Sequence, residues 1–125
     1  MLILGFAVMV GGQSQPAGVL LSQQELMQRM QNKDDLLLID VRTAGEFAMG
    51  HVPGAVNIPH TDLADRLGDV RPHHGQDIIV YCESGRRADV AKRLLRQAGL
   101  DRIRHLDGDM LAWRQAKLPI EKAAR

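Results

Sequence analysis

The sequence predicts an α/β fold in which a mostly parallel sheet is flanked by helices on both faces. Short runs of Leu, Ile and Val, which suit buried strands, alternate along the chain with segments whose apolar residues recur at helical spacing. The chain has 125 residues, of which 45% are hydrophobic and 25% are charged, and this suits one globular domain with its own core. In such a sheet, ligands bind beyond the carboxyl ends of the strands.

Residues 1–18 are expected to precede the domain, which takes up residues 19–125. Residues 1–10 are apolar and residues 11–18 are small and polar, which resembles the apolar region and cleavage zone of a secretory signal. The segment lacks a positively charged start, and it is shorter than the roughly twenty apolar residues that span a bilayer. We therefore expect an exported or periplasmic protein. The alternative is a disordered tail on a cytoplasmic one.

The first half of the domain carries clear helix signals. Capping boxes at Ser22 to Glu25 and at Thr43 to Glu46 begin two helices, and Gly68 is a stop signal for a third. The apolar runs between them are of strand length. The expected elements are a helix over residues 22–30, a strand over 36–39, a helix over 43–49, a turn over 51–54, a short strand over 55–58 and a helix over 61–67.

The second half repeats the alternation. A polar loop over residues 71–76 leads to an apolar strand over 78–81, and an amphipathic helix begins near Ala88 and stops at Gly99. A last strand is expected over residues 103–106. The last helix is expected over residues 110–115, with Trp113 facing the core.

The only cysteine, Cys82, lies where the strand over 78–81 meets a short loop and the following helix. A loop this short must curl, which points backbone N–H groups toward the sulfur, and N–H groups at a helix start attract anions. The positive charges of Arg86 and Arg87 add to this field and favour a reactive thiolate. The alternative is that Cys82 is a small buried hydrophobic residue, the usual fate of a free cysteine.

The other loop residues have distinct expected roles in binding an anionic substrate. Gly85 allows backbone angles closed to other residues, and Ser84 offers a hydroxyl donor to the sulfur or to a bound anion. The carboxylate of Glu83 opposes the positive field, so we expect it to point into solvent or to pair with an arginine. The predicted substrate-binding loop is therefore Glu83, Ser84, Gly85, Arg86 and Arg87.

Composition argues against several other classes of protein. The net charge is +1 and aromatic residues make up 3% of the chain, so there is no sign of a nucleic-acid surface. One cysteine excludes an intramolecular disulfide, a Cys-x-x-Cys pair and a thiolate zinc site. The five histidines show no metal-site spacing, and a structural role is expected for His51.

Several motifs together resemble the single-domain rhodanese family of sulfurtransferases. The resemblance covers roughly residues 19–120. It rests on residues 39–42 (IDVR), 46–47 (EF), 50–59 (GHVPGAVNIP), 80–87 (VYCESGRR) and 106–108 (LDG), followed by Trp113.

The resemblance implies that Cys82 takes sulfur from a donor such as thiosulfate, holds it as a persulfide and passes it to a thiol or cyanide-like acceptor, without metal or organic cofactor. It assigns Asp40 and Arg42 to a layer that supports the loop, and structural roles to Glu46, His51 and Asn57. Two features depart from the family pattern: the acidic Glu83, and Gly108-Asp109 in place of a frequent pair of glycines. Gly108-Asp109 is expected either to alter the wall beside the pocket or simply to cap the final helix. Each departure is a candidate cause of weaker thiosulfate binding and of preference for a different donor.

Three alternatives remain beside this hypothesis. A phosphatase of the related cell-cycle type needs an arginine six positions after the cysteine, where this chain has Ala88. A non-catalytic docking or regulatory module commonly lacks the cysteine. A sulfur carrier would use the same chemistry with a protein as donor or acceptor. We expect a monomer with no nucleic-acid partner.

Overall fold

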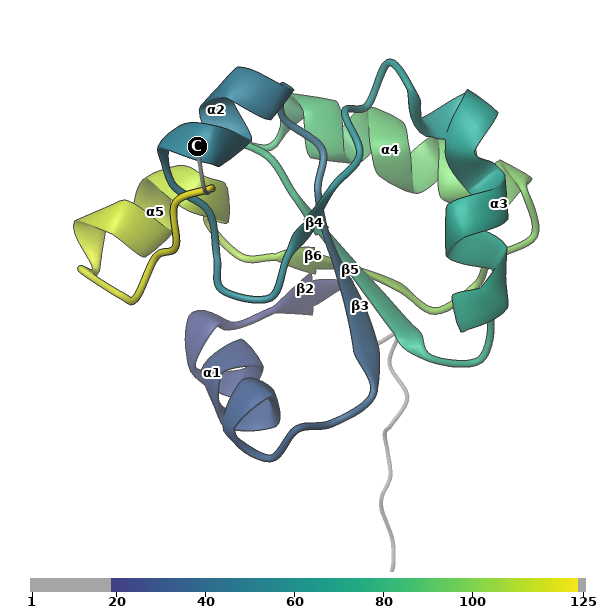
Figure 1. The fold of residues 1–125 in the computed structure, drawn as a ribbon. Helices are drawn as coiled ribbons and strands as arrows, with labels where there is room; N and C mark the ends of the chain where they lie inside the picture. Colours follow the sequence, from purple (N-terminus) through teal and green to yellow (C-terminus); the bar gives the residue numbers. More distant parts are fainter. Residues whose placement is uncertain (1–18, 124–125) are drawn as a thin grey trace, which may run out of the picture.

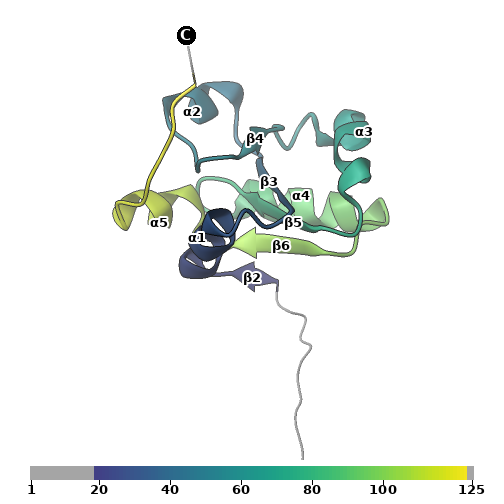
Figure 2. The same ribbon diagram turned by 60° about the horizontal axis from the view of Figure 1, so that its bottom comes forward.

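The computed structural model describes residues 19–123, which contain a five-stranded parallel sheet (Figure 2). The strand order is β2-β6-β5-β3-β4, so that β5 is the central strand. The predicted α/β fold with a parallel sheet is confirmed. The predicted export signal over residues 1–18 lies outside the described residues, and export remains a prediction. The strands are β2 (Leu20–Leu21), β3 (Leu36–Asp40), β4 (Val56–Asn57), β5 (Asp77–Tyr81) and β6 (Ile103–Leu106).

Helices connect successive strands of the sheet and cover it, as parallel strands require. Over residues 19–123, no helix is both long and apolar enough to cross a membrane. The helices are α1 (Gln23–Gln31), α2 (Ala44–Met49), α3 (Leu67–Val70), α4 (Arg86–Gln97) and α5 (Asp109–Gln115), with 3-10 turns η3 (Leu63–Arg66) and η4 (Arg71–His73) on either side of α3.

The core has two layers, one on each face of the sheet. Successive side chains of a strand point to opposite faces, so Ile78 and Val80 pack under α3 and α4 while Ile79 packs with α1 and α5. Figure 1 shows α1 and α4 on opposite sides of the strands. Trp113 is fully buried in the second layer, as predicted, and its indole N–H donates to the carbonyl of Pro119 at 2.7 Å. Burial of each such large side chain contributes about 1.5–3 kcal/mol.

The two predicted capping boxes differ in the structure. At α2 the box is complete: the Thr43 hydroxyl accepts from the Glu46 N–H at 3.2 Å, and Glu46 accepts from the Thr43 N–H at 3.0 Å. At α1 only half of the box forms, because Ser22 accepts from the Glu25 N–H but the Glu25 carboxylate forms an ion pair with Arg104. Helix α1 still begins where predicted.

The segment after β4 departs from the prediction. The single helix expected over residues 61–67 is instead the turn η3 followed by α3, and Gly68 lies inside α3 rather than ending it. Gly68 does not have the positive φ that ends a helix, since it is absent from the glycines that do. Leu63 and Val70 are both fully buried and hold these short helical pieces against the core. The expected loop over residues 71–76 therefore begins with η4.

Candidate active site

The ends of the strands bring the predicted site residues together at one edge of the sheet. Cys82 directly follows β5, Arg42 lies two residues beyond the end of β3, and Asp109 lies shortly after β6. Because the strands are parallel neighbours, their carboxyl ends lie side by side. The edge combines one thiol with several acidic side chains and several arginines.

The sulfur of Cys82 is held by backbone N–H groups, as the loop sequence predicts. It accepts hydrogen bonds from the N–H of Gly85 at 3.0 Å and from the N–H of Ala88 at 3.3 Å. Helix α4 begins at Arg86, two residues before the expected start, so the Ala88 N–H belongs to the first turn and has no partner within the helix. Gly85 has a φ of 117°, which favours glycine. Donors and helix dipole together stabilise an anionic sulfur at this point.

The side chains of the loop point in different directions. Ser84 and Arg86 are exposed, and within residues 19–123 neither side chain forms a hydrogen bond or ion pair. The guanidinium of Arg87 donates to the carboxylate of Glu46 at 2.7 and 3.0 Å. Glu83 pairs with arginines, one of the two expected outcomes. The substrate-binding role of the loop side chains remains a prediction. Of the two arginines that follow Gly85, Arg87 is paired and Arg86 forms no ion pair with the described residues.

Asp40 and Arg42 form a buried ion pair beneath the loop. The Arg42 side chain is 3% exposed and donates to both Asp40 carboxylate oxygens, at 2.7 Å in the shortest contact. Arg42 also donates to the carbonyl of Gly50 at 2.7 Å and reaches Glu83 of the loop at 3.4 Å. The amide of Asn57 donates to the carbonyls of both Asp40 and Arg42. These contacts connect β3 and β4 to the loop. Through them the pair would support the loop, as predicted.

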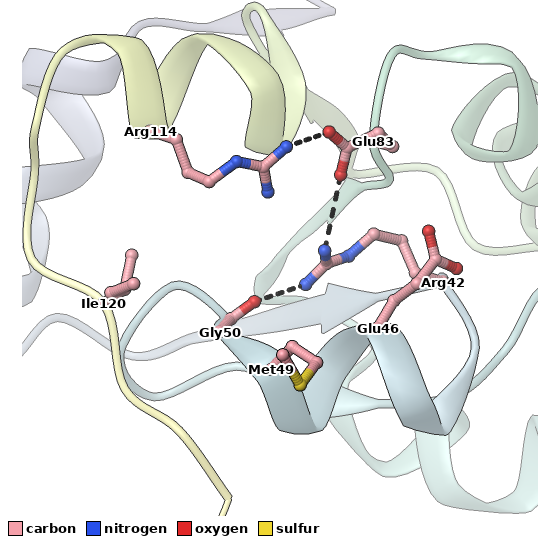
Figure 3. A pocket seen from close by; sticks show the side chains of 7 residues that line it. All are labelled: Arg42, Glu46, Met49, Gly50, Glu83, Arg114 and Ile120. Carbon is pink, nitrogen blue, oxygen red and sulfur yellow. Dashed lines mark hydrogen bonds and ion pairs between the residues drawn. The ribbon is translucent and has the colours of Figure 1, made fainter.

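A cleft of about 290 Å³ opens beside the loop (Figure 3). Glu83 lies between two guanidiniums there, since its carboxylate contacts Arg42 on one side and Arg114 of α5 on the other. Met49 adds an apolar wall and is 75% exposed. The lining residues are Arg42, Glu46, Met49, Gly50, Glu83, Arg114 and Ile120.

Three residues of this region were not predicted from the sequence. Asp109 is buried and accepts a hydrogen bond from the Cys82 N–H at 3.0 Å, and it lies 2.8 Å from Nε2 of His105. Arg114 reaches the cleft from α5. The sequence does flag Asp109 as a departure from the family pattern, but nothing local indicates its contact with Cys82.

The side chain of His51 contacts Phe47 of α2 and Glu121, and the structural role expected for it remains a prediction. It is 6% exposed, its ring stacks on Phe47 with centroids 3.6 Å apart, and its Nδ1 lies 2.9 Å from the carbonyl of Phe47. Among the residues that the structure describes, no three His, Cys, Asp or Glu side chains are grouped so as to hold a metal ion.

The comparison with protein families bears directly on this loop. The family model for the rhodanese-like domain matches residues 22–116, which include strands β3 to β6 and the Cys82 loop. This chain belongs to the rhodanese family. Individual relatives agree. A sulfurtransferase from Allochromatium vinosum is 34% identical over 100 residues, which make up 80% of this chain and 92% of that protein.

Other relatives place the rhodanese domain in different settings. The HTH-type transcriptional regulator Rv0324 from Mycobacterium tuberculosis is 39% identical over 106 residues, and the match covers 83% of this chain but only 45% of the regulator. The solution structure of the rhodanese-like domain of Alr3790 from Anabaena is 28% identical with a TM-score of 0.74, and the match covers 84% of this chain and 80% of that one. Since the chain spans about half the length of some relatives, the activities of those longer proteins are not carried over to it.

Proposed function

We propose that this rhodanese domain is a sulfurtransferase that carries sulfur as a persulfide on Cys82, with thiosulfate as a donor and a thiol or cyanide as an acceptor. The position of the Cys82 sulfur is the observation that supports this most. It lies at the start of α4 and accepts from the N–H groups of Gly85 and Ala88. Donors fixed in advance around an anion stabilise charge without reorganisation.

The proposed reaction has two halves. In the first, the Cys82 thiolate attacks the outer sulfur of thiosulfate, the S–S bond of thiosulfate breaks, and its electron pair leaves with sulfite. In the second, an acceptor thiolate attacks the outer sulfur of the persulfide. The bond between this sulfur and the Cys82 sulfur breaks, and its electron pair returns to the Cys82 sulfur. The charge is conserved in each half, so no external oxidant or reductant is needed.

The charges around the loop suit this sequence of steps. Arg86 is exposed at the start of α4, where it provides positive charge for an anionic donor and for departing sulfite. Glu46 offsets the charge of Arg87, Asp40 that of Arg42, and Glu83 that of Arg114. The site is therefore less positive than its number of arginines suggests, which favours modest affinity for thiosulfate.

A docking or regulatory module is the second candidate, because one relative is described as a transcriptional regulator. A phosphatase is not supported. Its signature arginine would stand at Ala88, which is fully buried and donates its N–H to the sulfur. The predicted monomeric state and the predicted partners remain proposals.

The test is to incubate the protein and its Cys82→Ser variant with thiosulfate, and to record intact mass and sulfite release. We expect only the wild type to gain one sulfur atom and to release an equal amount of sulfite. If Cys82 is alkylated by iodoacetamide at neutral pH but gains no sulfur, thiosulfate is wrong as the donor and polysulfide takes its place in the assay. A Cys82 that resists alkylation as well would leave the docking module as the better account.

A further inference from the structure

Asp109 combines two properties that are each unfavourable for an acidic residue. Its φ is 56°, in the left-handed region that favours glycine, and the residue is only 4% exposed. Lys33 and Lys117 also have positive φ within residues 19–123, but both are exposed. A buried carboxylate on such a backbone needs compensating contacts.

The contacts of Asp109 lead directly to Cys82. Its Oδ1 accepts a hydrogen bond from the Cys82 N–H at 3.0 Å and lies 2.8 Å from Nε2 of His105. A carboxylate only accepts hydrogen bonds, so Nε2 of His105 is the donor and fixes the carboxylate in place. The other ring nitrogen, Nδ1, lies 3.8 Å from the Asp89 carboxylate on α4. His105 is itself 6% exposed, so this arrangement is shielded from water.

The same turn holds Cys82 from its other side. The N–H of Met110 donates to the Cys82 carbonyl at 2.9 Å, so adjacent residues bind both the N–H and the C=O of the cysteine. The Asp109 carboxylate also reaches under the loop. A Cβ placed on Gly85, whose N–H donates to the sulfur, would lie 3.3 Å from Oδ2 of Asp109.

We propose that Asp109 is a positioning residue for Cys82, which fixes the sulfur relative to the N–H groups of Gly85 and Ala88 by accepting the cysteine N–H, while His105 holds Asp109. The inference rests on the proposed function of Cys82 as the nucleophile. The property of Asp109 that positions the sulfur is its hydrogen-bond acceptor, because this acceptor fixes the orientation of the Cys82 peptide group. Small errors in the position of a nucleophile lower the rate of the chemical step more than they weaken substrate binding.

The test compares Asp109→Gly, which removes the acceptor, with Asp109→Asn, which keeps an oxygen at the same place. Both residues tolerate a left-handed backbone, so neither change introduces strain there. Asp107→Asn is the matched control, since Asp107 is an exposed carboxylate on the same turn. We expect kcat for sulfur transfer to fall about tenfold in Asp109→Gly with KM nearly unchanged, and Asp109→Asn and Asp107→Asn to stay within about threefold of the wild type.

Two further measurements need no sulfur donor and so separate this inference from the proposed function. The first is the rate of Cys82 alkylation by iodoacetamide at neutral pH, which should follow the same order of variants as kcat. The second is the NMR resonance of the Cys82 amide proton, which should move upfield in Asp109→Gly and stay in place in Asp109→Asn. Both are read alongside thermal unfolding, which shows that each variant is folded.

Two results would overturn the inference. The first is an Asp109→Gly variant with the kcat and alkylation rate of the wild type. The second is an Asp109→Asn variant impaired as strongly as Asp109→Gly, because the acceptor would then not be what matters. If the wild type fails to take sulfur from thiosulfate, the proposed donor is wrong, while the alkylation rates and the amide resonance still decide the role of Asp109.

Discussion

The guanidinium of Arg87, in the first turn of α4, donates two hydrogen bonds to the carboxylate of Glu46 on α2, at 2.7 and 3.0 Å. The same carboxylate accepts from the Thr43 N–H and hydroxyl at the start of α2. The hydrogen bond from Arg87, with those from Thr43, lowers the pKa of Glu46 to about 2, from an ordinary value of 4.5. The Glu46 side chain therefore connects the start of α4, next to the Cys82 loop, to α2, which lines the cleft.

Replacement of Glu46 by Gln is expected to lower the free energy of unfolding by about 1 kcal/mol at pH 7, a figure reduced from the pKa difference because the pair is partly exposed. Gln can still complete the capping box, so the loss of stability measures the contribution of the Glu46 charge. Because the folded pKa lies below the unfolded one, the contribution of Glu46 is complete above pH 4.5 and is lost as the pH falls toward 2.

Urea unfolding of the wild type and Glu46→Gln at several pH values measures this. The two stabilities should converge as the pH falls through that window. A difference that stays constant from neutral to acid pH would show that Arg87 and Glu46 are not coupled by charge.

Replacement of Glu83 by Gln is expected to improve the use of thiosulfate. The Glu83 carboxylate contacts both Arg42 and Arg114 in the cleft, so its neutralisation removes one negative charge there. Arg42 stays paired with Asp40, and the guanidinium of Arg114 is left to attract a dianion. We expect KM to fall about twofold to fivefold, with the effect fading as salt screens the charges. Steady-state kinetics at low and high ionic strength measure it.

Glu25→Gln is the control for net charge, because Glu25 lies on α1 and pairs with Arg104 outside the cleft. It should leave KM unchanged. An equal fall in KM in both variants would mean that overall charge, rather than the position of Glu83, governs donor binding.

The parts of this site that could be predicted from the sequence are those set by short stretches of chain. The strand before Cys82, the helix after it and Gly85 between them lie within a few residues, and their hydrophobic pattern and backbone freedom are local properties. The complete capping box of Thr43 and Glu46 is local in the same way. From these features it could be predicted that the Cys82 sulfur lies at the start of a helix and that backbone N–H groups point toward it.

The contacts that complete the site are not local. Asp109 lies 27 residues from Cys82, and Arg87 lies 41 residues from Glu46. Which acidic side chain meets which N–H or guanidinium depends on the order of strands in the sheet, and a hydrophobic pattern does not specify that order. Gly68 was wrong as a stop signal for a related reason. A glycine ends a helix when its φ is positive, and Gly68 is not among the glycines with a positive φ, while Leu63 before it and Val70 after it both pack into the core.

Replacement of Gly85 by Ala is expected to impair both stability and sulfur transfer. At a φ of 117° an added Cβ is strained, and it would lie 3.3 Å from Oδ2 of Asp109 and 3.9 Å from His105. We expect a loss of about 1–2 kcal/mol in unfolding free energy and a slower reaction of Cys82 with iodoacetamide. Thermal unfolding and alkylation rates measure the two effects.

Gly45→Ala is the matched control, since Gly45 lies in α2 with no atom within 4 Å of an added Cβ. Alanine should stabilise this helix by up to about 1 kcal/mol without changing the alkylation rate. If Gly85→Ala behaves like Gly45→Ala, the strained turn is not required to hold the sulfur.

Replacement of Arg42 by Gln is expected to be the most damaging change to the layer beneath the loop. It leaves the Asp40 carboxylate buried at 0% exposure without its charged partner, and it removes the contact with the Gly50 carbonyl. Breaking a buried pair in this way costs about 3–5 kcal/mol. The exposed pair of Arg66 and Asp69 gives the comparison, since Arg66→Gln should change stability by less than about 1 kcal/mol.

The double variant Asp40→Asn with Arg42→Gln shows where that loss comes from. If the main cost is the uncompensated charge of Asp40, neutralising Asp40 as well should restore part of the stability, so the double variant will be less destabilised than the sum of the single ones. Urea unfolding of the four proteins measures the coupling. Strict additivity would mean that the two side chains stabilise the layer independently rather than as an ion pair.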